Sequence, residues 1–364
     1  MVGSELSDGG SGQGVGVGCV ILHAVAGRWG FTLARALKDG LGEMIRTKAL
    51  LNWLSVCMTW ALAAAAMPVG AVTLGDLYET DQPVLNNARE AAFVEALKTV
   101  VIRVSGQRDA PARLGSALGD PRKYVQRFGF TADNVLQVGF DSVSVDKMLQ
   151  DAGLPIWGRE RPATLVLLNV IESDGYAHWI TGDQPNVQKD ILGKAARERG
   201  LPLKWPAVDP QNITESTALQ EAERYGANAA LLGRVQGGAV RWTLLSSEGA
   251  SQASGGLEEG VHLAADTFAR VFAASGSSLG NVVVEVSGIG DLDAYASTLN
   301  YLEGMTLVRA VALEQVSGDT MRFKLAVRGD AATLRRAIAL DSRLVSQDDG
   351  SAPVGERLSF RYRP

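Results

Sequence analysis

The chain has 364 residues and a formal net charge of −5, with 46% hydrophobic residues and two cysteines. The slight acidic excess gives no electrostatic reason to bind nucleic acid or anionic lipid, and so few cysteines exclude a disulfide-stabilised scaffold. The length leaves room for two or three domains with adequate hydrophobic cores.

The longest apolar run lies in residues 44–71, behind a glycine-rich stretch. Arg46 and Lys48 precede a long uncharged run, and Val69-Gly70-Ala71 places small residues where a signal peptidase cleaves. We therefore predict a signal peptide over 44–71. The run is also long enough to cross a bilayer, so a membrane anchor is the alternative, and a buried core helix is a third interpretation. In the first two cases the basic residues before the run and the acidic residues after it place the rest of the chain outside the cytoplasm.

Residues 1–43 are interpreted as a disordered leader or, because Met44 can start translation, as a mis-assigned start. Cys19 and Cys57 both precede the predicted cleavage point. The exported chain would then contain no disulfide, and its stability would depend on its hydrophobic cores.

The first segment after the signal, residues 72–161, has the pattern of a small α+β domain. An extended stretch is followed by a long helix in NNAREAAFVEALKTVVIRVSG, with Asn87 as its N-cap and Gly106 as its stop. Its apolar face, at a helical spacing, comprises Phe93, Leu97, Val100 and Val104. A strand in NVLQVGF and a helix in VDKMLQDAG follow, so helices are expected to cover a small sheet.

Several motifs of this segment carry a family resemblance. They are YETDQPVLNNAREAAFVEALKTVVIRVSGQ, KYVQRFGF and GLPIWGRERPATLVLLNV, within residues 76–171. In these motifs the chain resembles a family of uncharacterised exported proteins of gammaproteobacteria, known only as a domain of unknown function. The resemblance implies export and supplies no catalytic residue.

The second segment, residues 162–275, predicts an α/β sandwich. TLVLLNVI is a continuous apolar run of strand length, typical of a strand buried on both faces. Helical and strand patterns then alternate, with a hairpin turning at Gly237-Gly238. In architecture this order is similar to the N-terminal domain of the translocation protein TolB.

The third segment, residues 276–364, predicts a ferredoxin-like βαββαβ domain. NVVVEVSGI reads as a strand, Asp291 caps a helix, and two strands form a hairpin around Ser317-Gly318-Asp319. RNA-recognition domains share this plan, but the segment has ten basic against eleven acidic residues and lacks their glycine-aromatic motif, so nucleic acid is not expected.

Candidate sites are few in this sequence. His178 and His262 have no partner at metal-ligand spacing, and no nucleophile elbow or phosphate loop occurs, so we expect no metal, no cofactor and no catalytic residue. Trp157, Arg159 and Arg161, in the linker after the first segment, form a possible recognition patch. The alternative is that the tryptophan packs against the neighbouring domain.

These observations predict an α+β or α/β protein of two or three small domains, exported to the periplasm. Its expected function is non-catalytic, as a protein-binding or scaffolding module with an envelope protein as partner. Membrane contact is expected only if residues 44–71 remain uncleaved. A small-ligand-binding protein and a periplasmic hydrolase that uses His178 are the alternatives.

Overall fold

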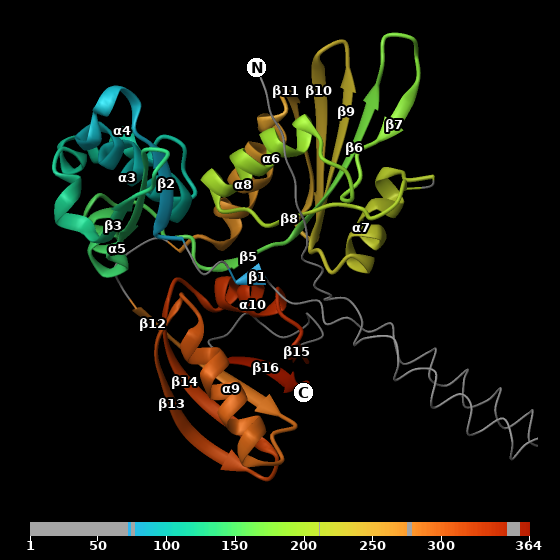
Figure 1. Cartoon of the computed structure of the whole chain (residues 1–364). Coiled ribbons are helices and arrows are strands. Elements are labelled where there is room, and N and C mark those ends of the chain that lie inside the picture. The colour runs from blue at the N-terminus through green and yellow to red at the C-terminus, as the bar shows by residue number, and fades with distance from the viewer. Residues whose placement is uncertain (1–71, 74–76, 211, 275–278, 348–356) are drawn as a thin grey trace, which may run out of the picture. The chain divides into compact units, whose positions relative to one another are not determined.

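A computed structural model describes residues 72–73, 77–210, 212–274, 279–347 and 357–364 (Figure 1). The predicted leader, the predicted signal peptide and both cysteines lie outside the described residues. Within the described ranges, no helix combines the length and the apolar character needed to cross a membrane.

Residues 68–364 form one compact unit that contains all three predicted segments. The buried side chains gather into cores that follow these segments: one core draws on residues 77–156, two on the middle segment and one mainly on the third. The α+β fold class is confirmed, because helices and sheets alternate in small units along the chain.

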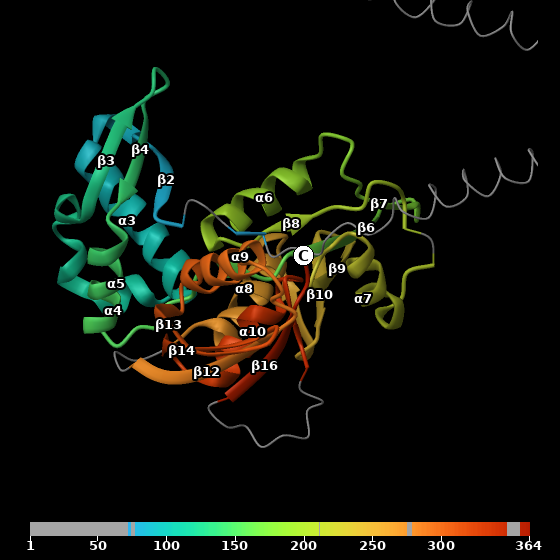
Figure 2. The same ribbon diagram turned by 90° about the horizontal axis from the view of Figure 1, so that it is seen from below.

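The first segment packs one long helix against a three-stranded antiparallel sheet of order β2-β4-β3 (Figure 2). Its elements are β1 (Val72–Thr73), β2 (Glu79–Pro83), η1 (Leu85–Asn87), α3 (Arg89–Ser105), α4 (Ala110–Leu114), η2 (Gly115–Leu118), η3 (Pro121–Tyr124), β3 (Val125–Phe130), β4 (Val135–Phe140), α5 (Ser142–Asp151) and β5 (Glu160–Arg161), which pairs with β1.

The predicted apolar face of α3 is completely buried, and Gly106 ends the helix with a φ of 72°. The predicted N-cap is wrong by one residue, since Ala88 occupies that position without a side-chain bond.

The middle segment contains β6 (Thr164–Ile171), β7 (Ala177–Trp179), α6 (Val187–Arg199), β8 (Leu203–Lys204), α7 (Glu215–Arg224), β9 (Ala229–Gln236), β10 (Ala239–Ser246), β11 (Gly249–Gly255) and α8 (Glu258–Phe272). Its sheet has the order β11-β10-β9-β6-β7, with β8 beside β6 and β6 parallel to β9 (Figure 1). Helices α6 and α8 share a core with one face, and α7 packs on the other. Strand β6 is therefore buried on both faces, as predicted, and the hairpin turns at Gly237 and Gly238.

The third segment contains β12 (Leu279–Ser287), α9 (Leu292–Gly304), β13 (Val308–Ser317), β14 (Thr320–Arg328), α10 (Ala331–Ala339), β15 (Leu344–Ser346) and β16 (Arg357–Tyr362). The sheet order is β13-β14-β12-β16-β15. Asp291 caps α9 as predicted, through a bond from Ala294 N–H at 2.7 Å. The ferredoxin-like plan holds through α10 and then changes. The short β15 takes the outer position and pairs antiparallel with β16, so β16 runs parallel to β12.

Candidate functional site

The three predicted recognition residues lie in two different environments. Trp157 and Arg161 are fully buried, whereas Arg159 is exposed. The three side chains therefore do not form one surface patch, because a partner cannot reach two of them. Trp157 belongs to the core of the middle segment, which is the packing alternative that the sequence left open.

The guanidinium of Arg161 joins the ends of two helices. It lies over the ring of Trp157, with Cζ 3.6 Å from the ring centroid. It donates hydrogen bonds to four main-chain oxygens, those of Gly158 (2.5 Å), Trp157 (2.8 Å), Arg103 (2.9 Å) and Arg199 (3.3 Å). Arg103 and Arg199 stand in the last turns of α3 and α6, where carbonyl groups lack helical donors and the helix dipole favours a cation. Burial, with Arg103 close by, lowers the pKa of Arg161.

A second buried arginine, Arg199, extends this junction to α8. It forms an ion pair with Asp266 at 2.6 Å and donates to the main-chain oxygen of Gly106 at 2.8 Å. Its Nη1 lies 3.2 Å from Nδ1 of His262, and burial, assisted by the charge of Arg199, lowers the pKa of that histidine. Arg161 and Arg199 therefore hold the first and middle segments together, and His262 is part of that support.

A cleft of about 680 Å³ lies where α5 and the start of β2 meet the third segment. The ionisable side chains that line it are Tyr78, Asp146, Lys147, Asp151, Arg159, Glu303, Arg309 and Arg328, and Lys147 pairs with Asp151. Arg159 is thus the only one of the three predicted recognition residues that lines this cleft.

Asp146 of α5 is the centre of a buried polar cluster in the cleft. Tyr78 donates its hydroxyl proton to Oδ1 at 2.6 Å. Arg309 and Arg328 donate to Oδ2 at 3.3 and 3.4 Å. The carboxylate side chain is 12% exposed, that of Arg328 is 7% exposed and that of Arg309 is 41% exposed. The outer arginine can therefore reach solvent while the inner one cannot.

The surroundings shift the pKa values of two members of this cluster, Tyr78 and Arg328. Burial raises the pKa of Tyr78, and the negative charge of Asp146 raises it further. The phenol is therefore neutral at physiological pH and acts as a hydrogen-bond donor. Burial and the neighbouring Arg309 lower the pKa of Arg328, and the ion pair with Asp146 opposes that effect. Asp146 accepts three donors and serves to orient the two arginines.

Main-chain contacts place Arg159 at the edge of the cleft. Its N–H donates to Oγ1 of Thr306 at 3.0 Å, and the N–H of Thr306 donates to Oε1 of Glu160 at 3.0 Å. A Cβ on Gly158 would lie 2.6 Å from Cβ of Thr306, so this close approach requires glycine. The Arg159 guanidinium makes no hydrogen bond or ion pair with another described residue.

This arrangement is suited to binding an anion. Arg159 and Arg309 present two accessible guanidinium groups, and planar guanidinium groups match carboxylate and phosphate oxygens. No cluster of side chains suited to a metal ion occurs among the described residues. His178 lies in β7 and stacks on Tyr176, and it lines neither this cleft nor the smaller one of about 330 Å³ beside β2, β3 and β4.

Sequence reasoning missed the centre of this site. One signal was available: Asp146 is an acidic residue on the buried face of α5, beside Val145 and Leu149, and a buried carboxylate requires a partner. Its partners Arg309 and Arg328 are 163 and 182 residues away in sequence. No local pattern joins positions so far apart.

The buried tyrosine predicts an alkaline loss of stability. Above pH 10 a tyrosine ionises in the unfolded chain, whereas Tyr78 stays protonated in the folded chain. The unfolded chain then binds fewer protons, so the free energy of unfolding falls with rising pH, by up to about 1.4 kcal/mol per pH unit for such a group. Urea unfolding between about pH 9 and 11 should show a shallower fall for Tyr78→Phe than for the wild type. The exposed Tyr176→Phe is the matched control, and parallel falls for Tyr78→Phe and wild type would contradict the prediction.

The fold and the cleft define an α+β protein with a cleft lined by three arginines among the described residues. Residues 71–158 match the family described as Domain of unknown function (DUF8605). The match confirms the resemblance of this segment to a family of unknown function, and it includes Tyr78 and Asp146. No curated protein and no solved structure matches the chain.

Proposed function

We propose that the protein is a non-catalytic module of the periplasm that binds an envelope protein partner in the cleft around Asp146. The observation that carries the proposal is the exposed Arg159, whose guanidinium faces the cleft without an internal partner among the described residues. The partner group is an acidic side chain or a terminal carboxylate, since these accept hydrogen bonds from guanidinium groups.

The rim of the cleft favours a protein over a small solute. Val143 lines the cleft and is 74% exposed, so it places an apolar contact beside the arginines. Arginine is enriched in protein interfaces, where such contacts exclude water from the polar groups.

The edge of the third sheet is the other surface considered for a protein partner. Strand β13 pairs with no described strand on its outer side, so a partner strand could add there. However, its register shifts between Val308 and Ala310 and again between Leu313 and Gln315. Such bulges interrupt the row of main-chain groups that an added strand needs, and they protect sheet edges from pairing. The cleft is therefore the better supported of the two surfaces.

Site-specific photo-crosslinking in the native cell tests the proposal. A photoreactive amino acid at Val143 should capture one partner protein from the periplasmic fraction, and Arg159→Glu should remove that product, since a carboxylate then faces a carboxylate. Val187, 71% exposed on α6, is the matched crosslinker control and should not give the product. The intact mass of this protein itself, purified without crosslinking from the same fraction, should correspond to a start at Val72, as the predicted signal peptide requires.

Other outcomes of this experiment decide between the alternatives. Equal capture from Val143 and Val187, or capture that persists in Arg159→Glu, would reject the cleft as the partner site. A cleft of about 680 Å³ is also large enough for a small molecule. Stabilisation of the wild type, but not of Arg159→Glu, by a small dicarboxylate or phosphate ester in a thermal-shift assay would favour the small-ligand alternative. If the protein is found in the membrane fraction and its mass shows that Met44 is retained, the membrane-anchor alternative is favoured over a cleaved signal peptide.

A further inference from the structure

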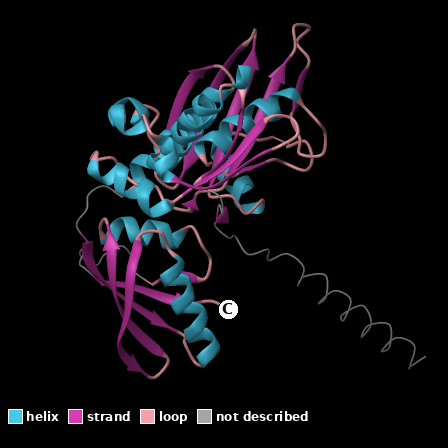
Figure 3. Cartoon of the chain, turned by 60° about the vertical axis from the view of Figure 1, so that its left-hand side comes forward, coloured by secondary structure: helices cyan, strands magenta, loops and turns pink. Residues whose placement is uncertain are grey.

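The five-stranded sheet of the third segment has one face that no described element covers over its central rows. At one end of this face Arg328 contacts Asp146 of α5. Helices α9 and α10 lie on the other face (Figure 3). The buried side chains of the central strands, among them Phe323, Leu325 and Phe360, belong to the core formed with these helices. Residues at alternate positions therefore point to the open face, because successive side chains of a strand point to opposite sides.

The open face gathers basic side chains from β14 and β16. In the register of the sheet, Lys324 and Arg357 flank Val283, and Arg322 and Ser359 flank Glu285. Arg361 lies one row further, opposite Ser287. Four cations thus surround one carboxylate within three neighbouring strands.

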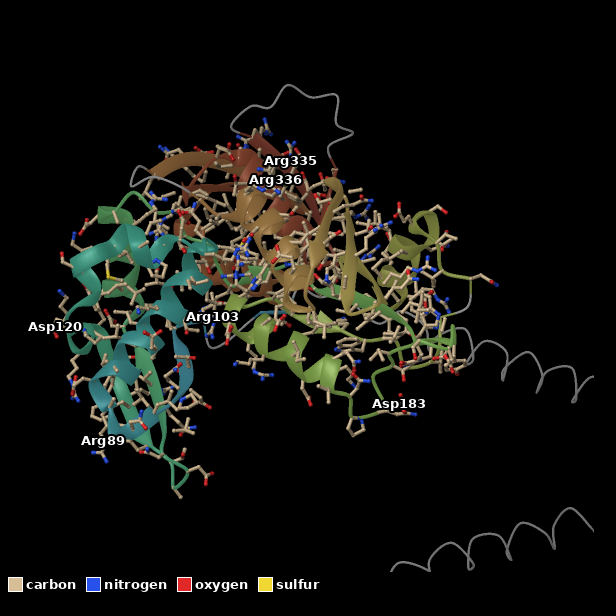
Figure 4. The ribbon with its side chains drawn as sticks, turned by 90° about the horizontal axis from the view of Figure 1, so that it is seen from above. Arg89, Arg103, Asp120, Asp183, Arg335 and Arg336 are labelled. Carbon is tan, nitrogen blue, oxygen red and sulfur yellow. The ribbon has the colours of Figure 1, made fainter. Side chains whose placement is uncertain are left out.

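Strand alternation separates charges that balance in the sequence. The segment as a whole has ten basic and eleven acidic residues, which gave no reason to expect binding to an anionic surface. On β14 and β16, however, Arg322, Lys324, Arg357 and Arg361 alternate with apolar residues that fill the core. The neighbouring arginines at 335 and 336 come from α10, on the helix-covered side, and do not belong to this face (Figure 4).

Two of the four cations on the open face have no charged partner among the residues that the structure describes. Glu285 pairs with Arg322 at 3.2 Å and with Arg357, and these bonds, that of Arg357 above all, lower the pKa of its carboxyl. Lys324 and Arg361 are exposed and make no hydrogen bond or ion pair with another described residue. With Glu285 ionised, these four cations and one carboxylate, counted among the described residues of β12, β14 and β16, sum to three positive units.

We infer that this face docks the protein on the surface of an anionic lipid bilayer. Attraction to anionic lipid headgroups requires clustered cations, and the face provides them. Protein interfaces are enriched in aromatic residues and depleted in lysine, and the aromatic Phe323 and Phe360 point away from this face. Single-stranded nucleic acid requires aromatic stacking, and the described residues of this face in β12, β14 and β16 offer no aromatic ring for it.

The dimensions of the patch make this contact weak, reversible and sensitive to salt. Neighbouring strands are about 4.8 Å apart, so the side chains of three strands lie within little more than one Debye length at physiological salt, about 8 Å. Their charges therefore act together on a bilayer. Each basic residue near an anionic surface strengthens binding roughly fivefold, so charge reversal at two positions should weaken it by well over tenfold.

Co-sedimentation of the full chain with lipid vesicles tests the inference. The wild type should sediment more strongly with vesicles of phosphatidylcholine mixed with phosphatidylglycerol than with vesicles of phosphatidylcholine alone, and added salt should remove the difference. Residues 44–71 are apolar and, where the chain retains them, would bind both vesicle types, so the difference between the two types is the quantity measured. The double variant Lys324→Glu/Arg361→Glu should lose that difference.

A second double variant separates this face from overall charge. Lys194→Glu/Arg197→Glu makes the same change of charge at exposed positions of α6 and should keep the preference for anionic vesicles. Far-UV circular dichroism checks that both variants are folded. No preference in the wild type, or an equal loss in both double variants, would overturn the inference. Binding to polyglutamate with no vesicle preference would point to an acidic protein instead.

Discussion

Replacing Arg161 by methionine should lower the free energy of unfolding by about 3 kcal/mol, near the upper end for a single substitution. Methionine can occupy the volume of the arginine stem but leaves four main-chain oxygens without their donor, among them those of Arg103 and Arg199. Each buried acceptor left unpaired costs about 1–3 kcal/mol, and relief of the buried charge offsets part of the sum. Equilibrium unfolding in guanidinium chloride measures the change.

Arg159 provides the matched control, because it is an exposed arginine two residues away. Arg159→Met should change the free energy of unfolding by no more than about 0.5 kcal/mol. Arg161→Lys should be intermediate, since lysine keeps the charge but lacks the planar fork that reaches both helix ends. Similar losses for Arg161→Met and Arg159→Met would mean that the guanidinium of Arg161 does not join α3 to α6.

The elements of this fold that sequence patterns predict are those whose residues are close together along the chain. The apolar face of α3, ended by Gly106, and the doubly buried strand β6 follow from periodicity alone. The end of the third sheet does not, because β15 is only three residues long and its pairing with β16 changes the direction of the last strand.

The candidate site shows the same limit. The place of Arg159 in the linker predicts a recognition residue, and its side chain lines the cleft. Arg161 has the same local sequence signal, yet its four acceptors come from three parts of the chain, and its burial depends on all of them. An exposed arginine and a buried one cannot be distinguished until the partners that surround them are known.

Replacing Gly260 by alanine should destabilise the protein by about 2 kcal/mol, although alanine is the better helix former. The ring of Trp242 lies against Gly260 of α8 and against Gly233, its cross-strand neighbour on β9. A Cβ at position 260 would lie 2.5 Å from Cδ2 of Trp242, and the indole cannot move aside because Nε1 donates to the main-chain oxygen of Gly256 and the residue is fully buried. The clash therefore outweighs the gain of about 1 kcal/mol in helix propensity.

The same substitution in α6 should have the opposite sign. A Cβ at Gly193 would meet only the end of the exposed Arg197 side chain, at 3.5 Å, which is an ordinary contact. Gly193→Ala should therefore raise the free energy of unfolding by about 0.5–1 kcal/mol, through helix propensity and a less flexible unfolded chain. Because both glycines lie inside helices, the difference between the two variants isolates the close approach of α8 to Trp242. If Gly260→Ala stabilised the protein as much as Gly193→Ala, the indole would have room to move and the packing between α8 and the sheet would be looser than the contacts indicate.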